Sequence, residues 1–351
     1  MTHPFWPRIS SRLLALSSLL VVGSLLISAP AARAQGPYHV AAQWKVGGDS
    51  FWDYMGVDPV SHLLYVTHGD QVVVVSPSGK VIDRMTGFKG LHGVAFDTAD
   101  KYGFLTDGGA NQVVVFNRKT RAIVARVPAG KGPDGLTFDP YSKTAWAFSG
   151  GSNTATVVSA RTLKVVATIQ LPGRPEFPVA DGQGYVYDNI ESLSKIVKIN
   201  ATTHKIVAAW SIAPGEGPSG LAIDAAHHRL FSVCHNGMMA IVDTGSGKVV
   251  ATVPIGKGPD AARFDPKHQL AFSSNGEGNL TVVHEDSPDK YTVVQTLSTK
   301  RGARTMGLNL DNGTIYTDTA DFGPMPKPKP GQRWVRPTLI PGSFTVLEIK
   351  R

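Results

Sequence analysis

Short apolar stretches separated by polar turns run along most of this chain. Within residues 221–253, apolar stretches at 221–224, 230–233, 239–243 and 248–253 are separated by turns that contain Gly, His, Asn or Ser. Apolar runs of this length, bounded by such turns, are typical of β-strands. The pattern therefore predicts four antiparallel strands joined by short hairpin turns.

The four-strand pattern returns at a period of about 42 residues. Its clearest copies are VPAGKGPDGLTFDP, which begins at Val127, and VPIGKGPDAARFDP, which begins at Val253, 126 residues later. Seven copies carry a turn that begins near Gly48, Gly90, Gly132, Gly173, Gly217, Gly258 and Gly302. Because one four-stranded sheet cannot cover both of its faces, these units predict an all-β fold, a seven-bladed β-propeller of four-stranded antiparallel blades.

The two ends of the repeat region predict how the ring closes. Residues 39–46 match the fourth strand of a unit but precede the first unit, and the last unit supplies only three strands, ending at 344–349. We therefore expect the N-terminal strand to join the last blade and to remove its open edge.

Residues 1–34 have the pattern of an export signal. Two arginines precede an apolar run over 13–27, and a small-x-small cleavage motif ends at Ala34. An apolar run of this length is short for a membrane span. We expect a signal peptide cleaved after Ala34, a periplasmic or secreted protein, and a single propeller domain over 35–351 without a membrane span.

Composition agrees with a turn-rich β fold. The 351 residues include 37 Gly and 24 Pro, and only 18% are charged, which is low for long solvated helices. Removing a leader with three arginines would lower the net charge from +8 to +5, with 32 basic and 27 acidic residues left. A mild, scattered positive charge is weak support for nucleic-acid binding. The single cysteine, Cys234, excludes an internal disulfide.

Four short motifs recur in the predicted strands and turns. They are LYVT at 64–67, NQVVVF at 111–116, GKGPDG at 130–135 and KVVATI at 164–169. These motifs resemble those of the YVTN-repeat, YncE-like family of bacterial seven-bladed propellers, over residues 38–350. The resemblance implies the fold and, since members of this family have been linked with DNA, raises DNA as a partner. It leaves the chemistry open, because propellers include binding proteins and enzymes.

One residue of each unit is expected at the mouth of the central channel. We count back five residues from the Asp that ends each first strand, namely Asp58, Asp97, Asp139, Asp181, Asp224, Asp265 and Asp311. The resulting ring is Asp53, His92, Asp134, Glu176, Ser219, Asp260 and Met306. Carboxylates around a narrow axis repel one another unless a cation or proton relieves them.

Five members of this ring are therefore candidate metal ligands. They are Asp53, His92, Asp134, Glu176 and Asp260. Carboxylates suit Ca²⁺ or Mg²⁺, and the histidine would admit a transition metal. Asp within a Gly-Pro-Asp turn is also explained by turn chemistry alone.

Further polar and aromatic residues surround the same channel mouth. Trp52 and Tyr54 flank Asp53, and Arg304 is the one basic residue close to the ring. Aromatic rings can stack a ligand, and Arg can anchor an anion. The candidate ligand-binding residues are Trp52, Tyr54, His68, Asp107, His235 and Arg304, of which His68, Asp107 and His235 stand at the ends of second strands. His68, His92 and Asp107 belong to neighbouring blades and could together hold a metal.

The last unit contains a long Pro-rich insertion, residues 321–337, between its second and third strands. Its proline content favours an extended conformation. Its basic residues are Lys327, Lys329, Arg333 and Arg336. The place of the insertion in the unit puts it on the face of the channel mouth, where it could act as a lid or as a docking arm for a partner.

These features favour an exported, monomeric binding protein that holds a small ligand, a cation or a segment of a partner protein at the channel mouth. An alternative is a metal-dependent hydrolase or lactonase, in which Asp53, Glu176 and Asp260 hold the metal. His92 would then be the base. A second alternative is a DNA-binding propeller, although an acidic channel mouth opposes phosphate. A divalent cation is the one cofactor that the sequence suggests.

Overall fold

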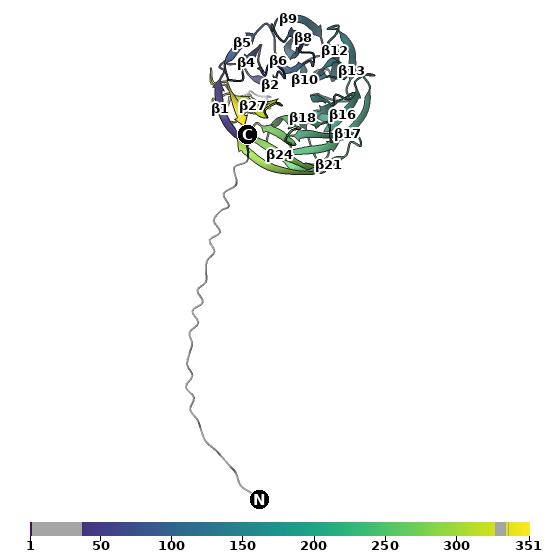
Figure 1. The fold of residues 1–351 in the computed structure, drawn as a ribbon, viewed down its shortest axis with the longest axis vertical. Helices are drawn as coiled ribbons and strands as arrows, with labels where there is room; N and C mark the ends of the chain where they lie inside the picture. Colours follow the sequence, from purple (N-terminus) through teal and green to yellow (C-terminus); the bar gives the residue numbers. More distant parts are fainter. Residues whose placement is uncertain (2–36, 327–334, 336) are drawn as a thin grey trace. The chain divides into compact units, whose positions relative to one another are not determined.

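The structure is a computed structural model that describes residues 1, 37–326, 335 and 337–351. Its strands form seven four-stranded antiparallel sheets arranged in a ring, which confirms the predicted seven-bladed propeller (Figure 1). Apart from its first residue, the predicted leader lies outside the described residues. Within the described part of the chain, no helix is long and apolar enough to cross a membrane.

The blades follow one another in sequence order, and the innermost strand comes first in blades 1 to 6. Blades 1 and 2 comprise β2 (Trp52–Val57), β3 (Leu64–His68), β4 (Gln71–Val75), β5 (Val81–Met85), β6 (Leu91–Phe96), β7 (Tyr102–Asp107), β8 (Gln112–Asn117) and β9 (Ile123–Pro128). Blades 3 and 4 comprise β10 (Pro133–Asp139), β11 (Thr144–Ser149), β12 (Thr154–Ser159), β13 (Val165–Gln170), β14 (Pro175–Ala180), β15 (Tyr185–Ile190), β16 (Lys195–Asn200) and β17 (Ile206–Ser211).

The remaining three blades continue the same order. Blades 5 and 6 comprise β18 (Pro218–Asp224), β19 (Arg229–Cys234), β20 (Met238–Asp243), β21 (Val249–Pro254), β22 (Pro259–Asp265), β23 (Leu270–Asn275), β24 (Asn279–Ser287) and β25 (Lys290–Ser298). Blade 7 comprises β26 (Met306–Asn309), β27 (Thr314–Thr319), β28 (Thr345–Lys350) and β1 (His39–Lys45). Two short 3-10 turns, η1 (Gly108–Ala110) and η2 (Glu191–Leu193), follow β7 and β15.

Burial decreases from the middle strands of a blade to its outermost strand. Every residue of β11 is buried, because neighbouring blades cover both faces of a middle strand. The outermost strand β17 alternates half-buried and exposed residues, as expected when one face of a strand meets water. The continuous and alternating apolar stretches of the repeat therefore correspond to different strand positions within a blade.

A break in strand pairing lies next to the channel mouth in most blades. In blade 1, the register between β2 and β3 shifts between Trp52 and Met55. In blade 2, the register between β6 and β7 shifts between Leu91 and Val94. Blades 3 to 6 show the same kind of shift near the start of the innermost strand. Such bulges redirect side chains, and each spans the position that the sequence assigned to the channel mouth.

Side chains of the second strands donate hydrogen bonds to the main chain of ring residues in the next blade. Oγ1 of Thr106 in blade 2 donates to the backbone oxygen of Asp134 in blade 3 at 2.6 Å. Nδ2 of Asn189 in blade 4 donates to the backbone oxygen of Ser219 in blade 5 at 2.7 Å. Because these bonds end on the main chain of ring residues, the position of each ring residue depends on its neighbouring blade.

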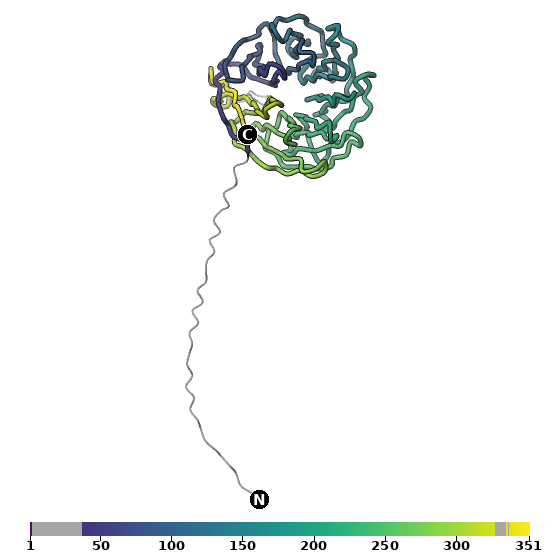
Figure 2. The backbone as a smooth tube through the Cα atoms, in the orientation of Figure 1, coloured from purple at the N-terminus to yellow at the C-terminus, as the bar shows by residue number. Residues whose placement is uncertain are grey.

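The first strand of the domain closes the ring. β1 pairs antiparallel with β28, and Figure 2 shows this purple segment beside the yellow end of the chain. Beyond the strand, the backbone nitrogen of Val46 donates to the backbone oxygen of Phe344 at 3.0 Å. The predicted closure is confirmed, and β28 has no open edge.

Candidate functional site

A cavity of about 720 Å³ opens at the channel mouth. It is bordered by blades 1, 2, 6 and 7 and by the described ends of the insertion. Much of its lining is glycine, which brings the main chain close to the cavity. The aromatic and charged side chains of the lining are Phe51, Trp52, Phe322, Asp53, His92 and Arg304.

The described ends of the insertion lie on the face that the sequence predicted. Phe322 forms an isolated antiparallel bridge with Leu339, and its ring lies 6.2 Å from the ring of Trp52, centroid to centroid. Phe322 and Pro337 both line the cavity. The basic residues of the insertion, Lys327, Lys329, Arg333 and Arg336, lie outside the described residues.

Strand pairing changes the seventh member of the predicted ring. In blade 2, Val94 pairs with Leu105, which is two positions before the end of β7, and the ring residue His92 is two positions before Val94. In blade 7, Met306 pairs with Thr317, which is two positions before the end of β27. Met306 is thus the counterpart of Val94, and the ring residue should be two positions before it. The ring residue of blade 7 is therefore Arg304.

The expectation of Met306 was wrong because the turn after β26 begins earlier than Asp311. Oδ1 of Asn309 accepts the backbone N–H of Asp311 at 3.0 Å. In blade 1, Oδ1 of Asp58 accepts the backbone N–H of Val60 in the same way, at 2.9 Å. Asn309 is thus the counterpart of Asp58, and Met306 lies fully buried in the core.

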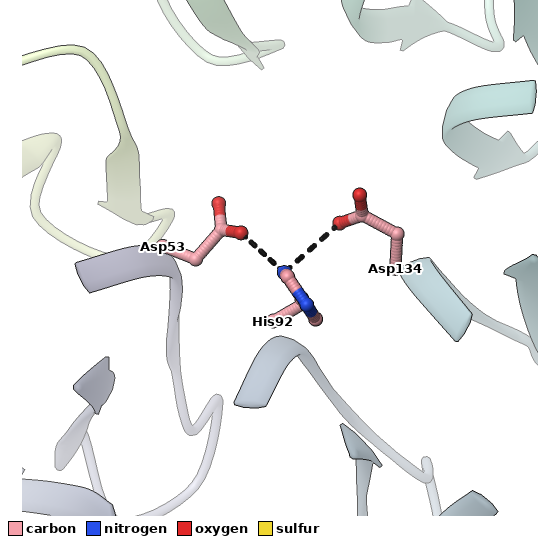
Figure 3. A group of neighbouring side chains, drawn as sticks. All are labelled: Asp53, His92 and Asp134. Atoms are coloured by element: carbon pink, nitrogen blue, oxygen red, sulfur yellow. Dashed lines mark hydrogen bonds and ion pairs between the residues drawn. The ribbon is translucent and has the colours of Figure 1, made fainter. Parts of the chain in front are cut away.

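Two carboxylates face one nitrogen of His92 (Figure 3). Nδ1 of His92 lies 2.6 Å from Oδ2 of Asp53 and 3.6 Å from Oδ1 of Asp134. Burial opposes a charge on this imidazole, but the hydrogen bond to Asp53 and the charges of both carboxylates outweigh it and raise the pKa of His92 to about 9. His92 is therefore a cation at neutral pH.

Arg304 brings a second positive charge to the ring. Its Nη1 bonds Oδ2 of Asp260 and lies 3.8 Å from Oδ1 of Asp53. The other oxygen of Asp260 accepts the hydroxyl of Ser219 at 2.9 Å and faces the hydroxyl of Tyr54 at 3.4 Å. The negative charge of Asp260 is thus neutralised by a side chain of the protein, Arg304.

The other two carboxylates of the ring hold a proton more readily than exposed ones. Burial, together with the charge of Asp53, raises the pKa of Asp134 to about 6. Burial, with the charges of Asp134 and Glu191, raises the pKa of Glu176 well above its usual value. Oε2 of Glu176 accepts a hydrogen bond from Nη2 of Arg174 at 3.2 Å. The cationic side chains of His92, Arg304 and Arg174 each pair with a ring carboxylate and therefore relieve part of the repulsion expected in this ring.

Aromatic side chains of blades 1 and 4 contact each other next to the ring positions. The rings of Tyr54 and Phe177 lie 4.7 Å apart, and the guanidinium of Arg263 lies 5.1 Å from the centroid of Phe177. A second cavity of about 350 Å³, with Phe177, Arg263 and Leu310 in its lining, opens at the other end of the channel. Phe177 thus contacts Tyr54, the residue after Asp53 of the ring, and also lines the second cavity.

The structure does not bring His68, His92 and Asp107 together as metal ligands. His68 is buried against the ring of Phe344, with the centroids 4.2 Å apart, and burial lowers its pKa to about 4. Asp107 is buried and accepts the backbone N–H of Lys89, in the connection between β5 and β6, at 3.0 Å. Neither residue belongs to a group of three potential metal ligands among the described residues.

The other predicted ligand-binding residues divide between the cavity and its surroundings. Trp52 and Arg304 line it. Tyr54 is buried and outside its lining. His235 is also outside its lining, with Nδ1 3.7 Å from Oε1 of Glu191. Two residues of the cavity lining, Phe51 and Phe322, were not among the predicted ligand-binding residues. Phe51 precedes Trp52, and Phe322 stands at the start of the insertion. These positions in the sequence were the signal that pointed to them.

One group in the ring has the geometry for a cation. Asp53, His92 and Asp134 each offer a ligand atom within 4.8 Å of the other two. The atom that faces both carboxylates is Nδ1 of His92, which carries a proton at neutral pH. A metal would have to displace that proton, whereas an organic ligand could use the ion-pair network as it stands.

Comparisons with known proteins agree on the fold. No family model and no curated protein sequence matches the chain. Among solved structures, the WD40 repeats of RRP9 align with a TM-score of 0.75 and 10% identity, over 90% of this chain and 99% of that chain. U3-55K aligns with a TM-score of 0.73 and 9% identity, over 89% and 98%. Kuenenia stuttgartiensis hydrazine synthase aligns with a TM-score of 0.68 and 15% identity, over 78% and 93%.

At these identities the similarity concerns the propeller fold alone. That fold is consistent with a binding or interaction role, since unrelated functions occur on the same scaffold. The function must therefore be argued from the cavity and its side chains.

Proposed function

We propose that this chain is an exported binding protein that holds a small aromatic or otherwise apolar anion in the channel-mouth cavity. The main observation in support of this proposal is the cavity of about 720 Å³, a volume within the range of small-molecule sites. Its aromatic lining supplies apolar contact, and its charged residues supply orientation. The proposal places the chain in the YVTN-repeat, YncE-like family, which its motifs resemble.

The charges exposed to the cavity favour a ligand with an acidic group. The side chains of His92 and Arg304 are 35% and 36% exposed, against 18% for Asp53. Nδ1 of His92 is occupied by Asp53, which leaves Nε2–H of the imidazolium to donate. The guanidinium of Arg304 has five N–H donors, and Asp260 and a backbone oxygen use only part of them. Both cations can therefore donate to a carboxylate or a similar anion.

Export rests on the opening segment of the sequence. Residues 1–34 combine two arginines, an apolar run and a small-x-small motif, which together characterise a secretory signal. The proposed location is the periplasm or the medium, and the ligand is then one met outside the cytoplasm.

The test is a binding panel of small aromatic carboxylates, each paired with its neutral primary amide. Isothermal titration should show binding of at least one carboxylate and a clear loss for its amide. R304Q should weaken binding by about 10- to 100-fold, the equivalent of one charge-assisted hydrogen bond. L310Q, in the second cavity, is the control and should bind as the wild type does. Equal binding of acids and amides, or no binding across the panel, would contradict the proposal.

A second candidate function is a metal-dependent hydrolase, because Asp53, His92 and Asp134 offer three ligand atoms in one place. His92 cannot act as its base while the imidazole is protonated at neutral pH. Turnover of lactones and esters should be measured after EDTA treatment and after addition of divalent ions. Turnover that metal restores would support this alternative, and inactivity with every ion would exclude it.

A further inference from the structure

Two acidic side chains and a histidine meet between blades 5 and 6. Asp224 ends β18, His227 follows it in the turn to β19, and Glu285 belongs to β24 of the next blade. Because β18 begins at the channel mouth and ends at Asp224, this cluster lies on the opposite face of the ring. Nδ1 of His227 lies 2.8 Å from Oδ2 of Asp224 and 3.3 Å from Oε1 of Glu285.

The carboxylates of this cluster are buried and incompletely bonded. Asp224 is 4% exposed and Glu285 is 1% exposed. Oδ1 of Asp224 accepts the backbone N–H of Ala226 at 2.9 Å, so that Oδ2 is left for the cluster. Oε2 of Glu285 is buried without a hydrogen-bond partner among the described residues. A buried oxygen without a partner carries a cost, which a bound cation would remove.

The equivalent place between blades 1 and 2 holds a positive charge. Arg118 of blade 2 and Glu285 of blade 6 occupy equivalent positions. The backbone nitrogen of Arg118 donates to the backbone oxygen of Lys101, just before β7, at 3.0 Å, and that of Glu285 donates to the backbone oxygen of Gln269, just before β23, at 2.9 Å. Nε of Arg118 donates to Oδ2 of Asp58 at 2.9 Å, and Asp58 is the counterpart of Asp224. Where blades 1 and 2 have an ion pair, blades 5 and 6 therefore bring together two carboxylates.

Among the described residues, no neighbouring arginine supplies the missing charge. Arg229, at the start of β19, uses Nη1 for Asp243 and Nη2 for Asp289. His227 is the one basic group that contacts both carboxylates of the cluster in the described part of the chain.

We infer that Asp224, His227 and Glu285 bind a divalent first-row transition ion, such as Zn²⁺, that ties blade 5 to blade 6. Ligand atoms about 2.1 Å from a tetrahedral ion lie about 3.4 Å apart, and the distances of 2.8 and 3.3 Å to Nδ1 are close to this spacing. The imidazole favours a transition ion over Ca²⁺ or Mg²⁺, which prefer oxygen ligands. The side chain of His227 is 36% exposed, so that an ion can reach the site from solvent.

A shared proton is the competing account of the same cluster. Burial, together with the contact to Asp224, raises the pKa of Glu285 to about 7, so a proton between the two carboxylates would also relieve their repulsion. The two accounts differ in their response to added Zn²⁺. A proton-sharing pair leaves Zn²⁺ unbound, whereas a metal site binds it with one-to-one stoichiometry.

The test is isothermal titration of Zn²⁺ into the chain, purified without a polyhistidine tag and stripped with EDTA. The wild type should bind one Zn²⁺ at this site. E285Q and H227A should bind it at least about tenfold more weakly, since even the loss of a residue that only supports a metal ligand costs that much. An excess of Ca²⁺ should not displace the ion.

The chain offers a matched control for the histidine. Nδ1 of His268 lies 2.7 Å from Oδ2 of Asp265, in the same turn of blade 6, but no third ligand joins them among the described residues. H268A should therefore retain the Zn²⁺ site, and so should H92Q, which alters the channel mouth. Absence of Zn²⁺ binding by the wild type, or equal binding by E285Q and H227A, would overturn the inference.

A further variant guards against loss of folding as the explanation. In E285R, the new arginine would pair with Asp224 as Arg118 pairs with Asp58. A side chain of the protein then supplies the positive charge in place of a metal ion. The variant should stay folded, lose the Zn²⁺ site and show no rise in melting temperature with Zn²⁺, while the wild type does show one. A folded E285R that still binds Zn²⁺ as tightly as the wild type would count against the site.

Discussion

The charge at the channel mouth depends on two single residues, His92 and Arg304. The sequence places carboxylates at four ring positions, yet the imidazolium of His92 lies between two of them and Arg304 is paired with a third. Among the charged side chains that line the cavity, the two cations are more exposed than Asp53. This is why we expect the site to select an anion, although its ring is rich in acid.

Replacing His92 with Gln should remove a pH-dependent part of the stability. The pKa of His92 is about 9 in the folded protein and about 6.5 in an unfolded chain. The imidazolium therefore stabilises the fold fully below about pH 6.5, and this contribution is lost as the pH rises towards about 9. We expect about 1–2 kcal/mol, less than the full shift implies, because the side chain is 35% exposed.

Urea unfolding of the wild type and H92Q measures this effect. The difference in free energy of unfolding should be larger at about pH 6 than at about pH 9.5. Asp53→Asn serves as the matched control, because it leaves the histidine in place but removes its hydrogen-bonded carboxylate. It should bring the His92 titration, followed by NMR, below that of the wild type. A wild-type midpoint near that of free histidine would refute the explanation.

Asp188 is a residue whose removal should stabilise the protein. It is fully buried in β15, and neither carboxylate oxygen has a hydrogen-bond partner among the described residues. Burial raises the pKa of Asp188 well above its usual value, so stability is lost as the pH rises above the pKa of the unfolded chain. Asp188→Val should raise the free energy of unfolding by about 1–3 kcal/mol at neutral pH and by less at about pH 4.

Thermal or urea unfolding of D188V at both pH values is the measurement. Ser232→Val is the control, because Ser232 has the equivalent place in β19 but donates to Oδ1 of Asn189 at 3.0 Å. That substitution should destabilise the protein. A loss of stability in D188V at neutral pH would show that the carboxyl group has a partner role that these contacts do not reveal.

At the scale of elements, the turn after each innermost strand is the recurring structural unit. Its Asp or Asn accepts backbone N–H groups of the turn, as Asp58 does from Val60 and Ser61 at 2.9 and 3.0 Å. Asp58 also contacts the next blade, because Nε of Arg118, the residue after β8, donates to Oδ2 of Asp58 at 2.9 Å. One side chain thus shapes a turn within its blade and joins two blades.

Arg118→Met should be among the most destabilising single changes. Arg118 and Asp58 are 4% and 1% exposed, so the change leaves a buried carboxylate without its cation. The expected loss is about 3–5 kcal/mol in free energy of unfolding, measured with urea. The double variant R118M/D58N should recover part of the loss, because Asn keeps the turn and carries no charge. Equal losses in the single and double variants would disagree with this account.

The repeat predicted strands well and the seventh blade less well. Apolar runs of four to six residues alternate with Gly, Asp and Asn turns, and this local pattern is enough to place strands in each blade. In blade 7 the turn begins at Asn309 instead of an Asp. Counting from Asp311 therefore shifted the ring residue from Arg304 to Met306.

At the scale of the whole molecule, a strand from the start of the domain closes the ring. Without β1, the hydrogen-bonding edge of β28 would be open to other chains. A chain that begins at residue 47 should therefore self-associate and unfold at a lower temperature than a chain that begins at residue 35. Light scattering coupled to gel filtration and a thermal melt measure both effects. The 35–351 chain should be a monomer, and a monomeric, equally stable 47–351 chain would refute this role of β1.

The number of blades, the closure and most ring positions follow from the sequence alone, because strand and turn signals are local and the repeat shows them seven times. The side chains that meet across the axis could be identified only from the folded ring. Arg304 reaches Asp260 from the next blade and also Asp53, on the far side of the ring closure. His68 and Asp107 are buried and do not join His92 in a group of potential metal ligands among the described residues. Strand periodicity specifies the face a side chain takes, whereas its charge partner depends on how blades distant in sequence pack around the axis.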